Sequence, residues 1–455
     1  MNKLNNLRLT AFGAAGEVGR SAFIIEDGEH AILLEAGIKL RPSNLLSLAP
    51  KGLKKRAKDL DAVILSHAHV DHSGYLPALW EAGYYGKLYM TNPTMDILEI
   101  LWLDHHKIEG ERHWTLNGME RAFQNTVTLP YKKKVKIADG ITLEFFNSGH
   151  IIGSAMSLID WKGIKILYTG DINDAQTPLF DGFHLPDVKV DILITEATNG
   201  DRKVIPRSEV NSEFIKELRN TLNSGKKVVI PSFAIGRSQE LLCILSEHIK
   251  DFPIYVDGMI NKMNVITEKY LTSDWVDETI LNRLKRDKIS SPLRGKNITS
   301  LTKENFDRVW EERKLIGQID EPLIIVTTSG MMEPSPVHEH LRNTAADQGN
   351  LIAVTGYQAE GTKGREIIEG AKKVMLSLGP GNAGEEEVEI NAKLMRFGFS
   401  GHTSSDGVKD LIEHTKPERV FLVHADVNNA TKMKELTTNG KIPELLEINK
   451  VVKLI

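Results

Sequence analysis

Four potential metal ligands lie close together near the start of the chain. His67, His69, Asp71 and His72 follow the apolar run at 61–65, which predicts a buried strand. Imidazole and carboxylate groups are the ligands that zinc selects when thiolates are absent. The end of a strand can hold such groups rigidly while leaving them open to a cleft. We therefore interpret the segment 66–72 as part of a metal site rather than as a solvated histidine-rich turn.

The same order, an apolar strand followed by a residue that can bind metal, recurs along the chain. The predicted strands at 30–35, 142–147, 164–168, 191–195, 397–399 and 420–423 end in or lead into Glu35, His150, Asp171, Glu196, His402 and His424. A single histidine or acid at a strand end more often has a structural role. The repetition therefore favours one shared site over several unrelated residues.

The number of candidate ligands exceeds what one tetrahedral ion needs. We expect two Zn²⁺ ions per chain, with Mn²⁺ or Fe²⁺ as alternatives, held by His67, His69, Asp71, His72, His150, Asp171 and His424. One ion would take His67, His69 and His150, and the other would take Asp71, His72 and His424. Asp171 would bridge the two ions. A hydroxide between the ions would be the nucleophile, because metal binding lowers the pKa of water to about 7.

Paired ions suit in-line displacement at phosphorus, because the charge that develops in the transition state is anionic. His402 has no ligand role in this division and is a candidate for protonating the leaving oxygen. Glu196 would orient His402 and keep it cationic by accepting its second N–H. The residues we expect to be catalytic are Asp71, His402 and Glu196.

Two further histidines are left out of this site. His105 and His106 lie at the end of the helix predicted at 93–106, beside Lys107. Histidines at a helix end commonly cap the helix or face solvent. We therefore expect both to lie outside the metal centre.

The composition is that of a globular chain without a strong charge bias. Of its 455 residues, 41% are hydrophobic and 26% are charged, and the formal net charge is −4. A polyanion would therefore have to bind local patches or metal ions. The one cysteine, Cys243, precludes an internal disulfide and fits a cytoplasmic location. Because we find neither a secretory segment nor an apolar run of about 20 residues, we expect no membrane association.

Helices and strands alternate from about residue 199, which predicts a parallel α/β sheet. In such a sheet, ligands bind the loops that follow the strands. Side chains that grip phosphates, and helix N-termini, are expected on these loops. The candidates for RNA or phosphate contacts are Arg237, Ser329, Gln358, Lys363 and Arg365.

These residues, in this order, resemble the metallo-β-lactamase superfamily. Its His-x-His-x-Asp-His signature stands at 67–72, and His150 and Asp171 match its third and fourth motifs. The β-CASP branch of nucleic-acid-processing members is matched by Glu196, by His402 in Phe-Ser-Gly-His and by His424 in Leu-Val-His. The segments 231–240 and 355–365 look more like the cleavage-and-polyadenylation (CPSF-like) nucleases than like RNase J.

The resemblance implies an α/β fold, a metallo-β-lactamase αββα sandwich into which an α/β β-CASP domain is inserted. The expected ranges are 1–198 and 381–455 for the sandwich and 199–380 for the insert. It also implies a zinc-dependent ribonuclease of RNA processing or decay that takes single-stranded RNA and acts as an endonuclease, a 5′→3′ exonuclease, or both. The chain departs from the usual pattern at Glu35, where Asp is common, and at Ala425-Asp426, where Gly-Glu is common. Glu35 is expected to contact a ligand rather than an ion.

Two other classes of function remain as alternatives. A catalytically silent RNA-binding paralogue would typically have lost ligands, whereas this chain keeps all seven. A small-molecule metallo-hydrolase of the same superfamily would need neither the inserted domain nor its Arg- and Lys-bearing loops. A monomer and a homodimer are both compatible with the sequence.

Overall fold

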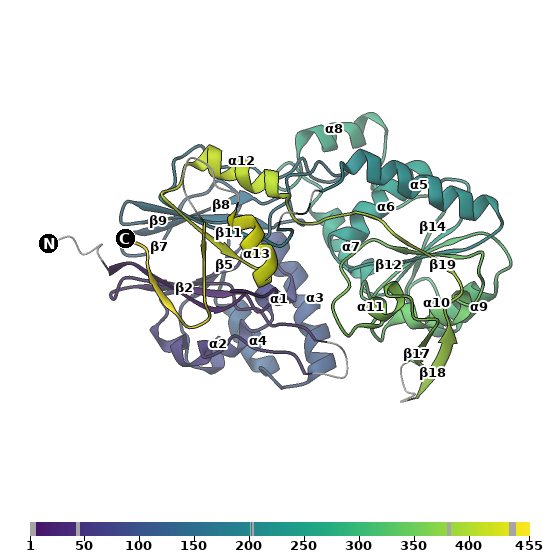
Figure 1. The fold of residues 1–455 in the computed structure, drawn as a ribbon, viewed down its shortest axis with the longest axis horizontal. Helices are drawn as coiled ribbons and strands as arrows, with labels where there is room; N and C mark the ends of the chain where they lie inside the picture. The colour runs from purple at the N-terminus through teal and green to yellow at the C-terminus, as the bar shows by residue number, and fades with distance from the viewer. Residues whose placement is uncertain (1–5, 42–45, 201, 203, 380–383, 436–442) are drawn as a thin grey trace.

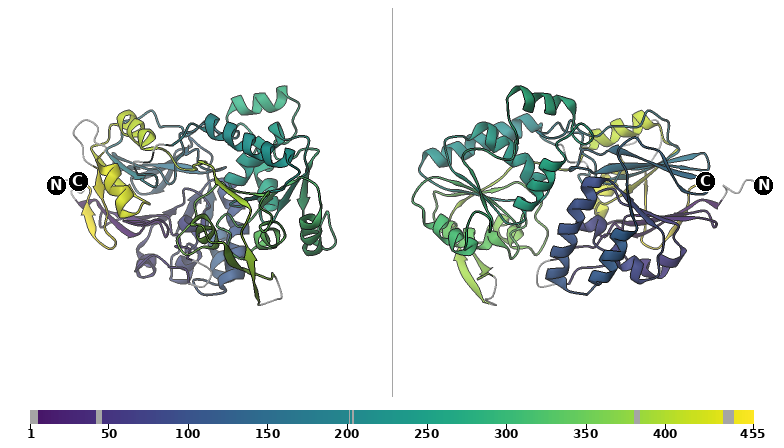
Figure 2. Two further views of the ribbon diagram at one scale, coloured as in Figure 1. Left: turned by 45° about the vertical axis from the view of Figure 1, so that its right-hand side comes forward. Right: turned by 180° about the vertical axis from the view of Figure 1, so that it is seen from behind.

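The structure, a computed structural model, describes residues 6–41, 46–200, 202, 204–379, 384–435 and 443–455. Figure 1 shows two lobes side by side. The first lobe, which we call the sandwich domain, contains both the earliest and the latest strands of the chain. The second lobe, which we call the inserted domain, is built from the middle of the chain, and the two views of Figure 2 show the same division.

Seven strands form the first sheet of the sandwich, in the order β22, β1, β2, β3, β4, β5, β6. Their bounds are Val451–Lys453, Arg8–Gly13, Ala22–Glu26, Ala31–Leu34, Ala62–Ile64, Lys87–Met90 and Thr126–Thr128. Strands β3 to β6 run parallel, and β3 and β4 are buried along their whole length. Strands covered on both faces have continuous apolar sequences, which explains the apolar run at 61–65 that precedes His67.

Seven strands also form the second sheet, in the order β21, β20, β11, β10, β9, β8, β7. Their bounds are Glu444–Leu445, Arg419–Val423, Ile192–Glu196, Ile164–Tyr168, Ala155–Trp161, Ile141–Asn147 and Val135–Ala138. The two sheets face each other across a core to which Phe23, Ile64, Phe145 and Phe421 contribute. Because β22 pairs with β1 and β20 pairs with β11, the last part of the chain completes both sheets.

Helices cover the outer faces of both sheets. Side chains of β3 and β4 share a core with Leu79, Trp80 and Trp102, while Leu167 and Leu193 pack with Leu411 and Met433. The helices on the first sheet are the 3₁₀ helix Leu53–Asp59, α1 (Val70–Ser73), α2 (Pro77–Glu81), α3 (Asn92–Glu109) and α4 (Leu116–Gln124). Those on the second sheet are α12 (Ser405–Thr415) and α13 (Val427–Lys434). This arrangement confirms the predicted αββα sandwich.

The inserted domain is built on a six-stranded sheet in the order β14, β13, β15, β12, β16, β19, and all its pairs are parallel. The strand bounds are Ile298–Leu301, Ile254–Asp257, Ile324–Thr327, Val228–Pro231, Leu351–Val354 and Lys393–Arg396. The helices are α5 (Arg207–Asn223), α6 (Arg237–His248), α7 (Ile260–Lys269), α8 (Glu278–Arg286), α9 (Val309–Gln318), α10 (Pro336–Thr344) and α11 (Lys363–Ile368). No helix in the described part of the chain is both long and apolar enough to cross a membrane.

The inserted sheet reaches further along the chain than the expected boundary at 380, a residue that itself lies outside the described ones. A hairpin of β17 (Lys373–Ser377) and β18 (Glu385–Glu389) projects from this domain (Figure 1), and β19 then pairs with β16. The chain therefore returns to the sandwich after residue 396. Strand β19 is a half-exposed edge strand, so it has no apolar run by which it could be recognised in the sequence.

A buried carboxylate at the end of β13 centres a charge network in the inserted domain. Asp257 accepts hydrogen bonds from Arg313 Nε at 2.7 Å, from Arg313 Nη2 at 2.9 Å and from His340 Nε2 at 2.8 Å. Burial favours its neutral form, but the bonds from His340 and Arg313 outweigh burial and lower the pKa of Asp257.

We expect Asp257→Ala to lower the free energy of unfolding at pH 7 by about 3–5 kcal/mol, because it leaves buried donors without their carboxylate. Since the folded pKa lies below the ordinary value of 3.8, this stabilisation is present above pH 3.8 and is lost as the pH falls through the folded pKa. Urea unfolding at pH 7 and at acidic pH measures both effects. Asp347→Ala removes the exposed partner of Lys226 and is the control, with an expected cost of about 1 kcal/mol or less. Equal costs for the two variants would contradict the assignment.

Candidate metal centre

The predicted ligands come together at the carboxyl ends of strands from both sheets. The segment 67–72 follows β4, His150 follows β8, Asp171 follows β10 and His424 follows β20. Two groups of side chains result, each with its ligand atoms within 4.8 Å of one another. The residues that sequence spacing could only suggest as neighbours are therefore neighbours in the fold.

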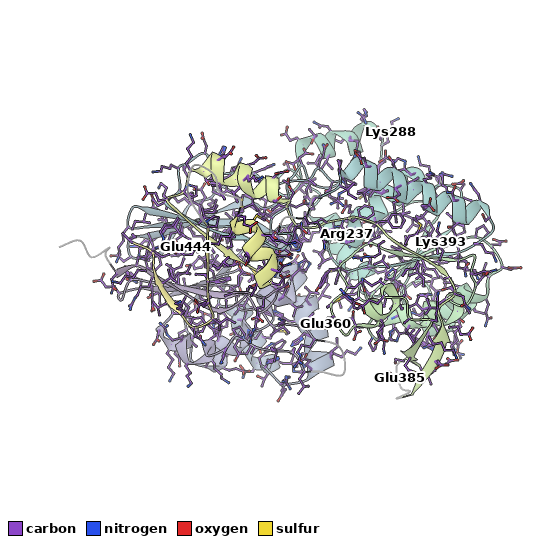
Figure 3. The ribbon with its side chains drawn as sticks, in the orientation of Figure 1. Arg237, Lys288, Glu360, Glu385, Lys393 and Glu444 are labelled. Carbon is purple, nitrogen blue, oxygen red and sulfur yellow. The ribbon has the colours of Figure 1, made fainter. Side chains whose placement is uncertain are left out.

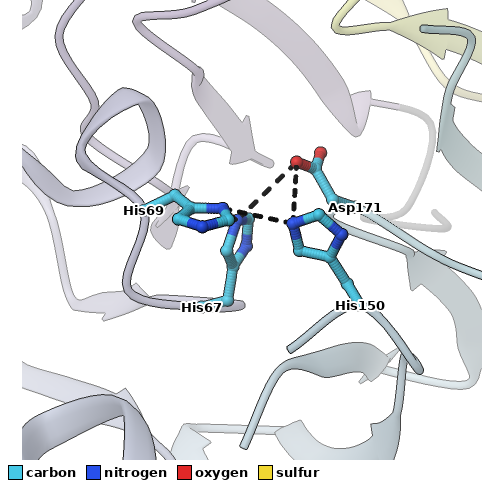
Figure 4. A group of neighbouring side chains, drawn as sticks. All are labelled: His67, His69, His150 and Asp171. Atoms are coloured by element: carbon cyan, nitrogen blue, oxygen red, sulfur yellow. Dashed lines mark hydrogen bonds and ion pairs between the residues drawn. The ribbon is translucent and has the colours of Figure 1, made fainter. Parts of the chain in front are cut away.

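The first group consists of three imidazoles and one carboxylate, which point toward one another in Figure 4. His69 Nδ1 lies 3.1 Å from His67 Nε2 and 3.1 Å from His150 Nε2. Asp171 Oδ2 lies 3.7 Å from each of the same two Nε2 atoms. Bonds of about 2.0–2.1 Å to a tetrahedral zinc place ligand atoms about 3.3 Å apart. The observed spacings fit four ligands of one such ion.

The hydrogen bonds around this group leave nitrogen lone pairs directed inward. His150 donates from Nδ1 to the Gly401 carbonyl oxygen at 2.7 Å, so its Nε2 is unprotonated in the neutral ring. His67 Nδ1 lies 2.9 Å from Ser66 Oγ. Burial lowers the pKa of His67, His69 and His150, so all three rings are neutral near pH 7 and able to bind metal.

The second group contains Asp71, His72 and His424. His424 Nε2 lies 3.2 Å from Asp71 Oδ2, and His72 Nε2 lies 3.9 Å from the same oxygen. Asp171 Oδ1 faces this group, at 3.4 Å from His72 Nε2 and 3.5 Å from His424 Nδ1. One carboxylate oxygen of Asp171 is thus directed to each group, which is the geometry of a bridging ligand.

Two buried polar atoms in these groups show whether the site suits a metal ion. His72 Nε2 and Asp171 Oδ1 are buried and have no hydrogen-bond partner in the described part of the chain. Buried polar atoms without a partner are costly and rare in folded proteins. A cation bound to both atoms removes that cost, so the donor set fits metal ions.

Glu35 and His424 end their strands in the left-handed backbone region, with φ of 63° and 53°. This conformation is unfavourable for residues other than glycine and is found at functional sites that hold it in place. It turns the Glu35 side chain to His72, whose Nδ1 donates to Glu35 Oε2 at 3.2 Å, while Ser66 N donates to Oε1 at 2.8 Å. The longer acid at position 35 therefore still contacts a ligand.

We expect Glu35→Gln to weaken metal binding about 10–100-fold. The glutamine oxygen can accept from Ser66 N, which leaves its NH₂ group facing His72 Nδ1. That nitrogen must then accept, so His72 Nε2 carries the proton and can no longer bind metal. Competition with a chelator measures the affinity. Glu35→Asp keeps two acceptor oxygens and is the control, with a smaller expected loss. Equal affinity of the glutamine variant and the wild type would contradict this role.

Glu196 and His402 form the predicted pair beside the centre. His402 donates from Nδ1 to Glu196 Oε2 at 2.8 Å, and Ile172 N donates to Glu196 Oε1 at 2.7 Å. His402 Nδ1 is also 3.9 Å from Asp171 Oδ2. Burial opposes protonation of His402, but Glu196 and then Asp171 outweigh it and raise the pKa of His402 to about 9. The side chain of His402 remains 24% exposed, so a substrate can reach it.

Among the predicted phosphate contacts, Arg237 lies beside a ligand of the first group. Its guanidinium pairs with Glu240 and lies over Phe399, 5.2 Å from the ring centroid. A Cβ placed on Gly401 would be 3.4 Å from His150 Cε1 and 3.8 Å from Arg237 Nη2. Figure 3 places Arg237 on the part of the inserted domain nearest the sandwich domain.

The other predicted contacts lie in the inserted domain, Ser329 and Gln358 on loops and Lys363 and Arg365 in α11, and they have partners there. Gln358 is 2% exposed and donates to the Gly330 carbonyl at 2.7 Å, so it joins two loops instead of presenting its amide to a ligand. Ser329 Oγ accepts from Met331 N at 3.2 Å. Lys363 and Arg365 pair with Glu366 and Glu369 on their own helix turn. Phosphate contact by Ser329, Lys363 and Arg365 stays a prediction.

Sequence reasoning missed Arg207, which links the two domains. Its Nη2 donates to the Ser400 carbonyl at 2.6 Å, its Nε lies 3.2 Å from Glu240, and its guanidinium lies 5.3 Å from the Phe399 ring centroid. Ser400 lies two residues before His402. Arg207 follows an irregular segment rather than an apolar strand, so the pattern that identified the ligands gave no signal for it.

Known proteins match nearly the whole chain. Residues 24–197 match the metallo-beta-lactamase superfamily domain, 238–367 the Beta-Casp domain and 387–443 the Zn-dependent metallo-hydrolase RNA specificity domain. The "Transcription termination factor FttA" of Methanothermobacter thermautotrophicus is 33% identical over 441 residues, which are 92% of this chain and 67% of that protein. This chain therefore spans about two-thirds of the length of that relative.

Two further proteins are similar over most of their own length. The "RNase J-like protein" of Methanocaldococcus jannaschii is 31% identical over 422 residues, which are 91% of each protein. A crystal structure of a protein of unknown function from Enterococcus faecalis V583 has a TM-score of 0.60 at 15% identity and covers 98% of this chain and 99% of its own, which supports the fold. Since the domain matches, the fold and the relatives agree, the chain belongs to the β-CASP family of metallo-β-lactamase-type metallo-hydrolases.

Proposed function

We propose that this chain is a zinc-dependent ribonuclease that hydrolyses phosphodiester bonds of single-stranded RNA as an endonuclease, a 5′→3′ exonuclease, or both. The observation that carries the proposal is Asp171, whose two carboxylate oxygens face separate groups of ligands beside the His402–Glu196 pair. Two divalent cations there would supply Lewis acidity toward the phosphate and lower the pKa of water. The residues that would hold them are His67, His69, Asp71, His72, His150, Asp171 and His424.

The protein's own side chains would place the substrate and move protons. His402 would donate a proton to the oxygen that leaves phosphorus, because it is held cationic and is partly exposed. Glu196 would fix the ring of His402 through the 2.8 Å bond to Nδ1, leaving Nε2 to face the substrate. Arg237 would bind a phosphate oxygen next to His150.

RNA is the substrate that the comparisons favour. The match at 387–443 is to an RNA specificity domain, and one similar protein is named RNase J-like. A cavity of about 860 Å³ lies between the two domains, lined by Asp174 and Ser404 on one side and by Arg207 and Arg283 on the other. Its lining mixes polar and apolar side chains and includes both acids and arginines, so the preference for RNA rests on the comparisons.

The test is an RNA labelled at either end, carrying a 5′-monophosphate or a 5′-triphosphate, incubated with the full chain. We expect cleavage that stops on addition of chelator and returns with Zn²⁺. Internal products from both labels indicate an endonuclease, and release of 5′ mononucleotides indicates an exonuclease. The control is DNA of the same sequence. RNA binding without cleavage by the metal-loaded chain would favour the silent paralogue, and turnover of a simple thioester or phosphodiester in preference to RNA would favour the small-molecule hydrolase.

A further inference from the structure

A second type of histidine–carboxylate cluster lies away from the metal centre, at the end of α3. His105 and Glu109 stand four residues apart on this helix, which places them on one face, and His113 follows in the loop to α4. One ligand atom from each of the three lies within 4.8 Å of the other two. The proposed ribonuclease activity makes no use of these residues.

The geometry within this cluster is that of ligands around a common point. His113 Nε2 lies 3.5 Å from Glu109 Oε2, close to the spacing of about 3.3 Å expected between ligands of a tetrahedral zinc. The rings of His105 and His113 are nearly parallel, with centroids 6.1 Å apart. Ser47, which is 1% exposed, places its hydroxyl 2.6 Å from Glu109 Oε2 and 2.7 Å from His113 Nε2. The Ser47 oxygen is therefore a fourth potential ligand atom beside those of His105, Glu109 and His113.

The chemistry of the donors selects the type of ion. Burial lowers the pKa of both His105 and His113, so their rings are neutral near pH 7 and carry a free lone pair. His105 is 7% exposed, so its ring lies inside the protein. Two imidazoles with one carboxylate form a known zinc ligand set, whereas Ca²⁺ and Mg²⁺ favour oxygen ligands alone.

We propose that His105, Glu109 and His113 bind one divalent transition-metal ion of the zinc class, at a third site separate from the catalytic centre. Ser47 or a water molecule completes the coordination. The ion joins the end of α3 to the segment that carries Ser47.

The location gives this site a structural role next to the catalytic ligands. Trp114 follows His113 and donates from Nε1 to the Gly74 carbonyl at 2.8 Å, while the His113 ring meets that of Tyr75 at 5.9 Å. Gly74 and Tyr75 directly follow α1, the helix that carries Asp71 and His72. An ion at His113 therefore stabilises the support of two catalytic ligands without contacting substrate.

Two features of the cluster oppose metal binding and sharpen the test. Arg112 Nε lies 3.7 Å from Glu109 Oε2, so its charge reduces the attraction of this carboxylate for a cation. The Ser47 hydroxyl can also join Glu109 to His113 by hydrogen bonds alone. A purely hydrogen-bonded cluster would hold no ion, so a count of bound metal distinguishes it from a metal site.

The experiment counts metal on the full chain. Protein stripped with chelator is reloaded with Zn²⁺, desalted and analysed by mass spectrometry for zinc per folded chain. We expect His105→Ala and His113→Ala each to hold one Zn²⁺ fewer than the wild type, and the neighbouring His106→Ala to hold the wild-type number. Because the result is a difference, it stands whatever number the catalytic centre binds. The same zinc content in His113→Ala and the wild type would overturn the proposal.

A second measurement needs no variant and covers the case in which one fails to fold. Crystals of the wild-type chain grown with Zn²⁺ are measured on both sides of the zinc absorption edge. An anomalous peak about 2.0–2.2 Å from ligand atoms of His105, Glu109 and His113 supports the site. Peaks confined to the catalytic centre would overturn it, even if RNA cleavage is observed.

Discussion

Replacement of Asp171 by asparagine is expected to reduce RNA cleavage by about 10³–10⁴-fold and to lower the bound metal. The several kcal/mol that paired metal ions contribute to transition-state stabilisation correspond to a loss of this size. Asp171 Oδ2 faces His67 and His150, while Oδ1 faces His72 and His424. An amide keeps one oxygen but presents NH₂ to the other group, and NH₂ is not a metal ligand. The measurements are the cleavage rate of labelled RNA and the metal content of the same sample.

The matched control for this prediction is Asp160→Asn, which changes a partly exposed carboxylate paired with Lys165 on the sandwich surface. It should leave metal content and cleavage near wild type, because surface ion pairs contribute little. Circular dichroism of both variants shows whether the fold is kept. A folded Asp171→Asn protein with wild-type metal content and rate would refute the bridging role.

The sequence predicted the metal centre because its signal is local. The ligands lie on the segments that follow β4, β8, β10 and β20, and strands buried on both faces have short apolar sequences that are easily recognised. Parallel strands present their carboxyl ends at one edge, so His67 after β4 and Asp171 after β10 had to lie near the edge of their own sheets. That the two edges face each other depends on packing between the sheets; the repeated pattern and the number of ligands favoured one shared site, and the resemblance to a known family supplied the sandwich that joins them.

Predictions were weaker where contacts come from loops and edge strands. His105 was interpreted as a helix-end residue that caps the helix or faces solvent, but it is 7% exposed, because the loop after Gly110 brings His113 and Trp114 back over it. Gly110 adopts a φ of 61°, which lets the chain turn there. Helical periodicity describes the helix alone and does not show what the following loop covers.

The interior of a loop is equally hard to foresee. Gln358 follows a strand of a parallel sheet, where ligand contacts are common, yet its side chain turns inward to the Gly330 carbonyl. Gly364 lies so close to the Gln358 side chain that a Cβ there would be 1.7 Å from Oε1. This packing between two loops brings residues about 30 positions apart into contact, and no spacing rule in the sequence encodes it.

Replacement of His402 by alanine is expected to slow RNA cleavage by about 10²–10⁴-fold while metal content stays at the wild-type level. His402 has no place in either ligand group, but its Nδ1 bond to Glu196 holds the ring beside Asp171. Loss of this ring removes a proton donor without removing a ligand. The measurements are single-turnover cleavage and zinc per chain. His106→Ala removes an imidazole outside both the ligand groups and this pair, and it should cleave at a rate near wild type.

The dependence on pH distinguishes a proton donor from a merely structural histidine. Glu196 raises the pKa of His402, so Glu196→Gln should lower that pKa. His402 acts in its protonated form, and activity therefore falls as the pH rises through its pKa. The alkaline fall in the cleavage rate should begin at a lower pH in Glu196→Gln than in the wild type, with metal content unchanged. Glu413→Gln, a substitution on the outer helix α12, should leave the profile in place. If Glu196→Gln lowers the rate equally at every pH and does not displace the alkaline limb, His402 has a structural role. Equal rates for His402→Ala and the wild type at equal metal content would remove His402 from the reaction.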